Sequence, residues 1–231
     1  MKLGIFTDSH YSSAELTCGV RRNNMSLGKI ERAYEHFKKE SCDLIVCLGD
    51  LLDTEPSVEM EIENLKQIAK IVKNCDIPSV FIMGNHDAFT LSPEEFYKNL
   101  GTEPPHDIKT DGKNLIFLDA CYLNIGRHYA PGDHDWTDTY YPHTEELYKK
   151  LKEARGDTYI FVHQNIDPTV SPDHRISNSD DILHHINESG VVKAVFQGHC
   201  HWGSSYEEMG VKYITLPAMC EKEDGFFIFD I

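Results

Sequence analysis

Short apolar runs of strand length recur along the chain, and each run ends at a cluster of polar residues or glycine. These runs occupy residues 3–6, 44–48, 79–83, 159–162 and 194–196. Between them, apolar residues recur at helix spacing with charged residues in between, most clearly over 26–40 and 62–72. Strands that alternate with helices predict an α/β protein with much parallel pairing. Near the end of the chain, 203–209, 211–217 and 225–230 read as short strands and predict an antiparallel addition.

Length and charge restrict the class of protein. The chain has 231 residues, of which 40% are hydrophobic and 26% are charged, so we expect one globular domain over residues 1–231. The formal net charge of -16 argues against duplex nucleic acid as the main partner, because nucleic acid is bound mainly through cationic side chains. It does not exclude a small anionic substrate, because bound divalent cations would cancel much of the local carboxylate charge.

The sequence also indicates a compartment. The apolar run at the amino terminus is too short for a signal peptide, and no stretch is long and apolar enough to span a bilayer. The seven cysteines form an odd set without CxxC spacing, and several lie in apolar runs, as Cys47 does. This usage favours buried reduced thiols over a disulfide framework. We therefore expect a cytoplasmic protein that makes no membrane contact.

The polar clusters that end the predicted strands carry metal-ligating side chains. They read Asp8-Ser9-His10, Gly49-Asp50-Leu51-Leu52-Asp53, Gly84-Asn85-His86-Asp87, His163, and Gly198-His199-Cys200-His201. Each cluster taken alone is also ordinary turn or core chemistry. Ligand sites in open α/β sheets lie at the carboxyl ends of the strands, so five such clusters predict a dinuclear metal site. Carboxylate, amide and imidazole ligands together suit manganese, iron or zinc.

In their order and spacing, these clusters resemble the DxH, GDxxD, GNH(D/E), His and GHxH motifs of the calcineurin-like metallophosphoesterase family. The match runs from Asp8 to His201, and no motif is missing. The resemblance implies an α/β fold in the form of a four-layer αββα sandwich, with two mixed β-sheets flanked by helices. It also implies two metal ions and their ligands: Asp8, His10, Asp50 and His201 for one ion, and Asp50, Asn85, His163 and His199 for the other.

The reaction implied by the resemblance is hydrolysis of a small-molecule phosphodiester, a nucleotide diphosphate linkage or a phosphomonoester. A hydroxide that bridges the two metal ions would attack phosphorus. His86 resembles the family's non-ligand histidine, which stabilises the transition state or protonates the leaving oxygen. Asp53 stands where the family often has a carboxylate that orients this histidine, and its alternative role is a cap at a helix start.

Three departures narrow the branch of the family. The GDLLDT segment lacks the Arg-Gly of protein Ser/Thr phosphatases, and Asp53 replaces the tyrosine ligand of purple acid phosphatases. The acidic composition argues against DNA-repair nucleases. Residues 19–27 are similar to the arginine-rich segment of manganese-dependent ADP-ribose/CDP-alcohol diphosphatases, and the cyclic-nucleotide phosphodiesterases are the other branch considered. Arg21 and Arg22 are therefore candidate ligands for a second phosphate, or else a solvated basic pair beside a helix start.

The long segment 119–143 has no clear periodicity and is rich in rings: Tyr122, His128, Tyr129, His134, Trp136, Tyr140 and Tyr141. It is either a lid or insert whose aromatic side chains stack on a base or a nicotinamide-like ring, or an ordered loop that covers the sheet edge with its own small core. The run Asp133-His134-Asp135 suggests a third metal site, which no further ligand spacing supports.

An alternative to catalysis is a metal-binding scaffold that acts in protein interaction, as do some members of this fold that have lost ligands. The presence of all seven predicted ligands and of His86 favours an enzyme. A metallo-β-lactamase-like hydrolase is disfavoured, because its HxHxDH motif is absent.

Overall fold

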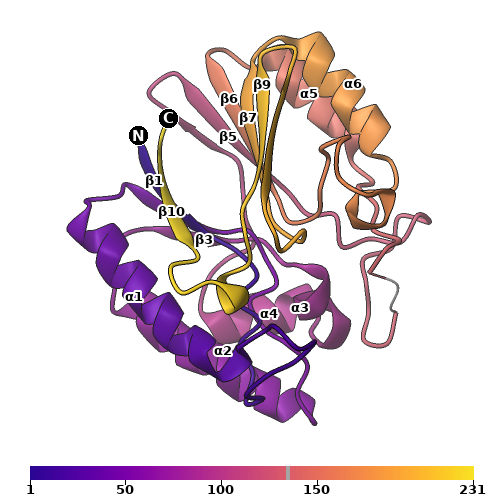
Figure 1. Ribbon diagram of the computed structural model, residues 1–231. Coiled ribbons are helices and arrows are strands. Elements are labelled where there is room, and N and C mark those ends of the chain that lie inside the picture. The colour runs from indigo at the N-terminus through magenta and orange to yellow at the C-terminus, as the bar shows by residue number, and fades with distance from the viewer. Residues whose placement is uncertain (134–135) are drawn as a thin grey trace.

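Two β-sheets lie face to face in the computed structural model, which describes residues 1–133 and 136–231 (Figure 1). The smaller sheet has the strand order β10-β1-β2-β3. Its strands are β1 (Lys2–Phe6), β2 (Leu44–Cys47), β3 (Ser79–Phe81) and β10 (Phe226–Asp230). The larger sheet has the order β4-β5-β6-β7-β9-β8. Its strands are β4 (Ile108–Thr110), β5 (Lys113–Leu118), β6 (Asp157–Val162), β7 (Val192–Gln197), β8 (Ser204–Glu208) and β9 (Val211–Thr215).

Helices cover the outer face of each sheet (Figure 1). Those beside the smaller sheet are α1 (Ser26–Lys39), α2 (Val58–Lys73), α3 (Asn85–Thr90) and α4 (Pro93–Leu100). The larger sheet is covered by α5 (Thr144–Glu153) and α6 (Ser179–Ser189). The predicted four-layer αββα sandwich of two mixed sheets is therefore confirmed, and α1 and α2 lie where the apolar periodicity predicted them.

Three apolar clusters fill the spaces between the four layers. One contains buried residues of α1, α2 and α4, a second packs α5 and α6 on the larger sheet, and the third lies between the two sheets. Successive side chains of β1 point to opposite faces of the sheet, which explains why the sequence is apolar from Leu3 to Phe6. Leu3 and Ile5 belong to the cluster between the sheets, while Phe6 belongs to the cluster on the helical side. A strand that is buried on both faces has apolar side chains on both, so its sequence does not alternate between apolar and polar residues.

The carboxyl-terminal strands only partly match the predicted antiparallel addition. β8 and β9 form an antiparallel pair, but β9 lies parallel to β7. β10 leaves that sheet and pairs antiparallel with β1 in the smaller one. The chain therefore crosses from one sheet to the other after β9, and the short 3-10 turn η3 (Met219–Glu221) lies on this crossing.

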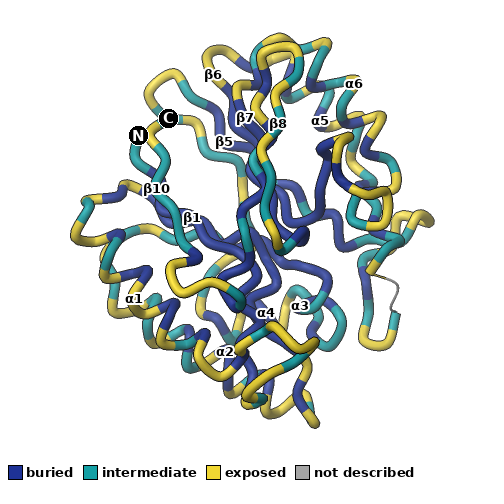
Figure 2. The backbone as a smooth tube through the Cα atoms, in the orientation of Figure 1, coloured by how far each residue is buried: buried dark blue, intermediate teal, exposed yellow. Residues whose placement is uncertain are grey.

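The loops at the carboxyl ends of the central strands are buried, unlike most loops. Residues 7–12, 48–53 and 163–167 are buried throughout, and the dark backbone in Figure 2 continues from the sheets into this region. Both sheets thus direct polar loops into one interior zone.

Cysteine usage agrees with the prediction of thiols rather than disulfides. All seven cysteines are free, and five of them are buried: Cys42, Cys47, Cys121, Cys200 and Cys220. Within residues 1–133 and 136–231, no helix has the length and apolar character needed to cross a membrane.

Candidate metal centre

Four of the predicted ligands lie in a backbone conformation that residues other than glycine rarely adopt. The φ angles are 52° at Asp8, 44° at His10, 49° at Asp50 and 65° at His199. A residue other than glycine is strained in this left-handed region, which costs free energy. Such residues are enriched at functional sites. Each one lies just beyond a strand, where an abrupt turn directs its side chain toward the others.

Two glycines allow the loops to approach closely. A Cβ atom on Gly84 would lie 2.1 Å from Oδ1 of Asp50, and one on Gly198 would lie 2.1 Å from Oγ1 of Thr7. Asp87 then ties two of the loops together, because its carboxylate accepts hydrogen bonds from the backbone N–H groups of Gly84 and Leu52, at 3.0 and 2.9 Å.

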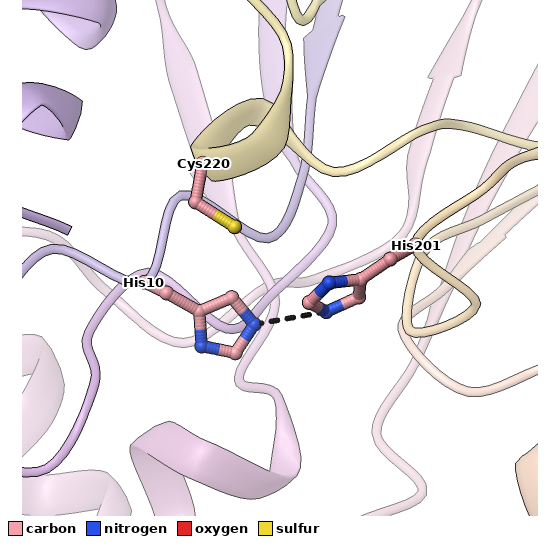
Figure 3. Close-up of side chains that lie close together, drawn as sticks. All are labelled: His10, His201 and Cys220. Atoms are coloured by element: carbon pink, nitrogen blue, oxygen red, sulfur yellow. Dashed lines mark hydrogen bonds between the residues drawn. The ribbon is translucent and has the colours of Figure 1, made fainter. Parts of the chain in front are cut away.

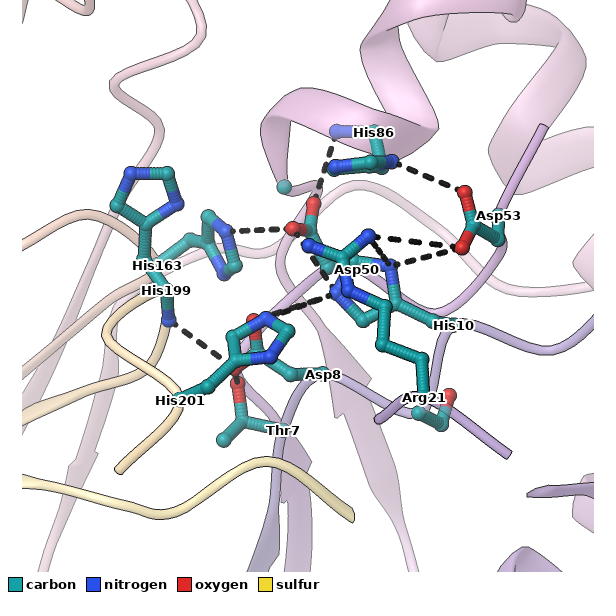
Figure 4. A network of polar contacts seen from close by, with 12 residues as sticks. Thr7, Asp8, His10, Arg21, Asp50, Asp53, His86, His163, His199 and His201 are labelled. Carbon is teal, nitrogen blue, oxygen red and sulfur yellow. Dashed lines mark hydrogen bonds and ion pairs between the residues drawn. The ribbon is translucent and has the colours of Figure 1, made fainter. Parts of the chain in front are cut away.

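A first group of ligand atoms surrounds Nε2 of His10 (Figure 4). This nitrogen lies 3.7 Å from Oδ1 of Asp8, 3.6 Å from Oδ2 of Asp50 and 3.1 Å from Nε2 of His201. His201 Nε2 lies 3.4 Å from Oδ1 of Asp8. Ligand atoms about 2.0–2.2 Å from one ion are separated by distances of this size, so these four side chains fit a single metal site.

A second group shares Asp50 with the first. Oδ2 of Asp50 lies 3.2 Å from Nε2 of His163, which in turn lies 3.2 Å from Oδ1 of Asn85. His199 also has a ring nitrogen within 4.8 Å of these Asp50 and His163 ligand atoms. One carboxylate oxygen therefore faces both groups, which is the arrangement that a bridging ligand requires.

The chemistry of the donors fits cations. Among the described residues, Oδ1 of Asp8 and Nε2 of His199 are buried without a hydrogen-bond partner, although buried polar atoms are normally satisfied. Burial lowers the pKa of His10 to about 4, so its imidazole is neutral at neutral pH. Burial alone would also lower the pKa of His163, but the Asp50 carboxylate raises it to about 9, so a bound cation would have to displace a proton from His163. Burial alone would raise the pKa of Asp8, but the neighbouring rings of His10 and His201 hold it well below its ordinary value.

Outer hydrogen bonds orient two of the histidines. Nδ1 of His163 donates to the backbone oxygen of Leu48 at 3.0 Å, and Nδ1 of His201 lies 2.6 Å from Oε1 of Glu221. In each ring these contacts leave Nε2 to face the ligand groups. Glu221 could not be identified from the sequence, because no motif surrounds it and the crossing after β9 brings it to His201.

Cys220 lies beside the first ligand group (Figure 3). Its Sγ atom is within 4.8 Å of the ligand nitrogens of His10 and His201, and its backbone N–H donates to the backbone oxygen of Asp8 at 3.1 Å. Burial raises the pKa of this thiol, so it is protonated at neutral pH. Cys220 is therefore a neutral neighbour of the first group.

The side chains of His86 and Asp53 lie next to the ligand groups. Nδ1 of His86 is 3.3 Å from Oδ1 of Asp53, and Oδ2 of Asp53 accepts a hydrogen bond from Nδ2 of Asn23 at 2.8 Å. Asp53 is not the cap of α2, because Ser57 occupies that position and accepts from the N–H of Met60. The geometry therefore favours the orienting role of Asp53 over the capping role.

The two candidate arginines lie apart. Arg21 lines the cavity beside the ligand groups, and its NH1 is 3.5 Å from Oδ2 of Asp53. Arg22 is exposed and lines a separate hollow together with Glu15 and Met25. The structure brings only Arg21 to the site.

A cavity of about 400 Å³ opens over the ligand groups. Besides predicted residues, its lining includes side chains that the sequence analysis missed: Cys18, Val20, His174, Trp202 and Glu221. Trp136 also lines it, whereas Tyr129 and Tyr141 from the same 119–143 segment belong to the apolar clusters. Residues of the segment therefore contribute to both alternatives: Tyr129 and Tyr141 pack in the apolar clusters, and Trp136 lies at the cavity. Of the suggested third metal site, His134 and Asp135 lie outside the described residues.

The four-layer fold, with acidic and imidazole side chains gathered at its strand ends, is that of the calcineurin-like phosphoesterases. The chain belongs to the calcineurin-like phosphoesterase family, whose model matches residues 1–203. It is 26% identical to the 3',5'-cyclic adenosine monophosphate phosphodiesterase CpdA of Haemophilus influenzae, covering 95% of this chain and 77% of the relative. It is 20% identical to a probable cyclic nucleotide phosphodiesterase of Fibrobacter succinogenes, covering 99% and 84%.

Comparison with solved structures shows the same fold. The chain is similar to a dimetal phosphatase from Danio rerio with a TM-score of 0.80 and 16% identity, and the match covers 95% of this chain and 88% of that one. The family model thus confirms the predicted family, and this structural match confirms the predicted fold.

Proposed function

We propose that this protein is a dinuclear metal-dependent phosphodiesterase that hydrolyses a small-molecule phosphodiester, with cyclic nucleotides as the first substrates to test. The observation that carries the proposal is the position of Asp50, whose Oδ2 lies 3.6 Å from Nε2 of His10 and 3.2 Å from Nε2 of His163. A carboxylate oxygen between two sets of neutral and acidic ligands supports two ions held close together. The names of the curated relatives support the choice of cyclic nucleotides.

The two ions would be held by the two groups of side chains that share Asp50. These are Asp8, His10, Asp50 and His201 for one, and Asp50, Asn85, His163 and His199 for the other. Manganese, iron and zinc all accept this donor set. When bound, the ions supply a nucleophile made from water and neutralise charge on the phosphoryl oxygens.

The chain's own residues complete the reaction. His86 lines the cavity, and its Nδ1 is engaged by Asp53, so Nε2 is the nitrogen available to the substrate. From this position His86 stabilises the transition state or donates a proton to the leaving oxygen. Asp53 holds the ring in place, and Asn23 in turn holds Asp53. Arg21 contributes a positive charge at the cavity wall, where it binds a phosphate oxygen of the substrate.

A second candidate function, hydrolysis of a nucleotide diphosphate linkage, is favoured by Arg21 alone. A second phosphate in the cavity would pair with this guanidinium. Arg21→Ala should then reduce ADP-ribose cleavage far more than cleavage of a simple monoester. Equal losses on both substrates would assign Arg21 to the phosphate that both compounds share.

The experiment that tests the proposal is hydrolysis of bis-p-nitrophenyl phosphate and of a panel of cyclic nucleotides, dinucleotides and phosphomonoesters, with each metal added separately. We expect metal-dependent turnover that EDTA abolishes and that Asp50→Ala removes together with bound metal. A protein that retains two equivalents of metal but turns over no phosphoester would instead be the non-catalytic scaffold. A cytoplasmic location, which the sequence favours, stays a prediction.

A further inference from the structure

Both tryptophans of the chain, Trp136 and Trp202, line the cavity over the candidate metal centre. They come from distant segments, since Trp136 lies in the 119–143 segment and Trp202 directly follows His201. Their exposed fractions are 37% and 65%, and neither belongs to any of the three apolar clusters. Large exposed aromatic side chains that gather at a concave site are typical of ligand contacts rather than of packing.

The ring of His174 joins the two tryptophans. Its centroid lies 5.1 Å from that of Trp136 and 5.3 Å from that of Trp202, with interplanar angles of 64° and 65°. Trp136 and His174 also contact the ring of His199, at 5.8 and 5.5 Å. We call Trp136, His174 and Trp202 the aromatic wall. It forms a continuous set of ring contacts that begins at a predicted metal ligand and extends to an exposed ring.

The cavity restricts what the aromatic wall can bind. A volume of about 400 Å³ suits a small molecule rather than a folded partner. The wall adjoins His199, so a ligand whose phosphate lies at the metal centre would place its neighbouring group against these rings. The exposed side chain of Val20 lines the same cavity and adds apolar surface. A flat aromatic group separated from phosphate by a sugar matches this combination.

We infer that the aromatic wall binds the base of a nucleotide whose phosphate is held at the metal centre. The inference rests on the proposed function, because it requires phosphate at that centre. Stacking tolerates different bases, since every base has a π-face. The wall therefore selects nucleotides over phosphate esters without a ring, and it does not select one base over another.

The test compares two inhibitors of bis-p-nitrophenyl phosphate hydrolysis by the metal-loaded enzyme: adenosine 5′-monophosphate and ribose 5-phosphate. Both carry the phosphate, but only the first carries a base. We expect the inhibition constant of the nucleotide to be lower by about 5- to 100-fold, the range that stacking on an aromatic side chain provides. In Trp202→Ala and Trp136→Ala this ratio should fall toward one, while the inhibition constant of ribose 5-phosphate stays unchanged.

Two further variants make the comparison specific. Trp202→Phe should keep most of the preference, because it keeps a ring. Met209→Ala removes another exposed apolar side chain, in the turn between β8 and β9, and should leave the ratio as in the wild type. A wild-type ratio near one, or a ratio that survives in the Trp136→Ala/Trp202→Ala double variant, would overturn the inference.

Binding can also be measured without catalysis. Since both tryptophans lie in the aromatic wall, adenosine 5′-monophosphate should quench the intrinsic tryptophan fluorescence of the metal-loaded protein, and ribose 5-phosphate should not. If no phosphoester is hydrolysed, the proposed function fails and this titration still decides the inference. If hydrolysis occurs but the nucleotide neither quenches nor competes better than the sugar phosphate, only the inference fails.

Discussion

Oδ1 of Asp53 lies 3.3 Å from Nδ1 of His86, and this contact joins the loop after β2 to the start of α3. The backbone N–H of His86 donates to Oδ1 of Asp50 at 2.8 Å, so the same histidine is also fixed to a predicted ligand. His86 is thus held by one carboxylate at its ring and by another at its backbone. Because the His86 ring is already fixed, its Nε2 can face a substrate, and little conformational entropy of the side chain is lost when the substrate binds.

We predict that Asp53→Asn lowers kcat by about 10- to 100-fold without removing metal, because it loosens a ring that acts on the substrate. His86→Ala should lower kcat by about 100- to 10,000-fold. In the His86→Ala background, Asp53→Asn should have little further effect, because the ring that it orients is gone. Rate measurements with parallel determination of bound metal check this. Additive losses would show that Asp53 acts independently of His86.

We predict that Glu221→Gln weakens metal binding about 10-fold or more, because Glu221 orients the ring of His201. Glu223 provides a matched control, since it lies two residues further on and its carboxylate pairs with exposed Arg32, away from the ligand groups. Glu223→Gln should therefore leave the metal affinity unchanged. Competition with a chelator of known affinity measures the effect. Equal affinities in the two variants would exclude an orienting role for Glu221.

We predict that Gly84→Ala severely reduces metal binding and stability, because the added methyl group would lie 2.1 Å from Oδ1 of Asp50 and 2.3 Å from its backbone nitrogen. Gly28→Ala is the control, since it lies in α1 and its Cβ would meet no atom within 4 Å. Alanine in a helix should raise the free energy of unfolding there by about 0.5–1 kcal/mol. Denaturant unfolding and metal analysis of both variants test the contrast, and a mild effect of Gly84→Ala would contradict the required close approach.

The sequence locates the candidate ligands better than the other residues that line the cavity, and the reason is physical. Asp8, Asp50, Asn85 and His199 each end a recognisable strand, so a local pattern locates them. Glu221 and His174 have no such pattern, because the crossing after β9 brings Glu221 to the cavity and the long connection after β6 brings His174 there. Their positions depend on tertiary packing.

The strand pairings likewise include one that a local sequence pattern could predict and one that depends on tertiary packing. The pair β4 and β5 was not predicted, although Asp111-Gly112 between them is a typical hairpin turn and both residues have positive φ angles, 44° and 74°. That signal was available in the sequence. The pairing of β10 with β1 was not, because an isolated apolar strand does not indicate which sheet edge it will complete.

The last prediction concerns pH and lies away from the metal centre. His128 has an acceptor at both ring nitrogens: the backbone oxygen of Tyr129 lies 2.9 Å from Nδ1, and Oδ2 of Asp119 lies 3.2 Å from Nε2. Two acceptors favour the doubly protonated ring. Burial alone would lower the pKa of His128, but the contacts with Asp119 and Tyr129 raise it above its ordinary value.

A raised pKa in the folded protein stabilises the fold most at low pH. The contribution of His128 is fully present below the pKa of the unfolded chain, roughly 6.5, and is lost as the pH rises through the higher folded value. His128→Gln should therefore reduce the free energy of unfolding more at pH about 5.5 than at pH about 9, with the larger loss on the acidic side. Urea unfolding of the wild type and the variant at the two pH values measures this difference. If the loss were equal at both, or larger at high pH, the ring would be neutral in the folded protein and the ion pair with Asp119 would contribute nothing.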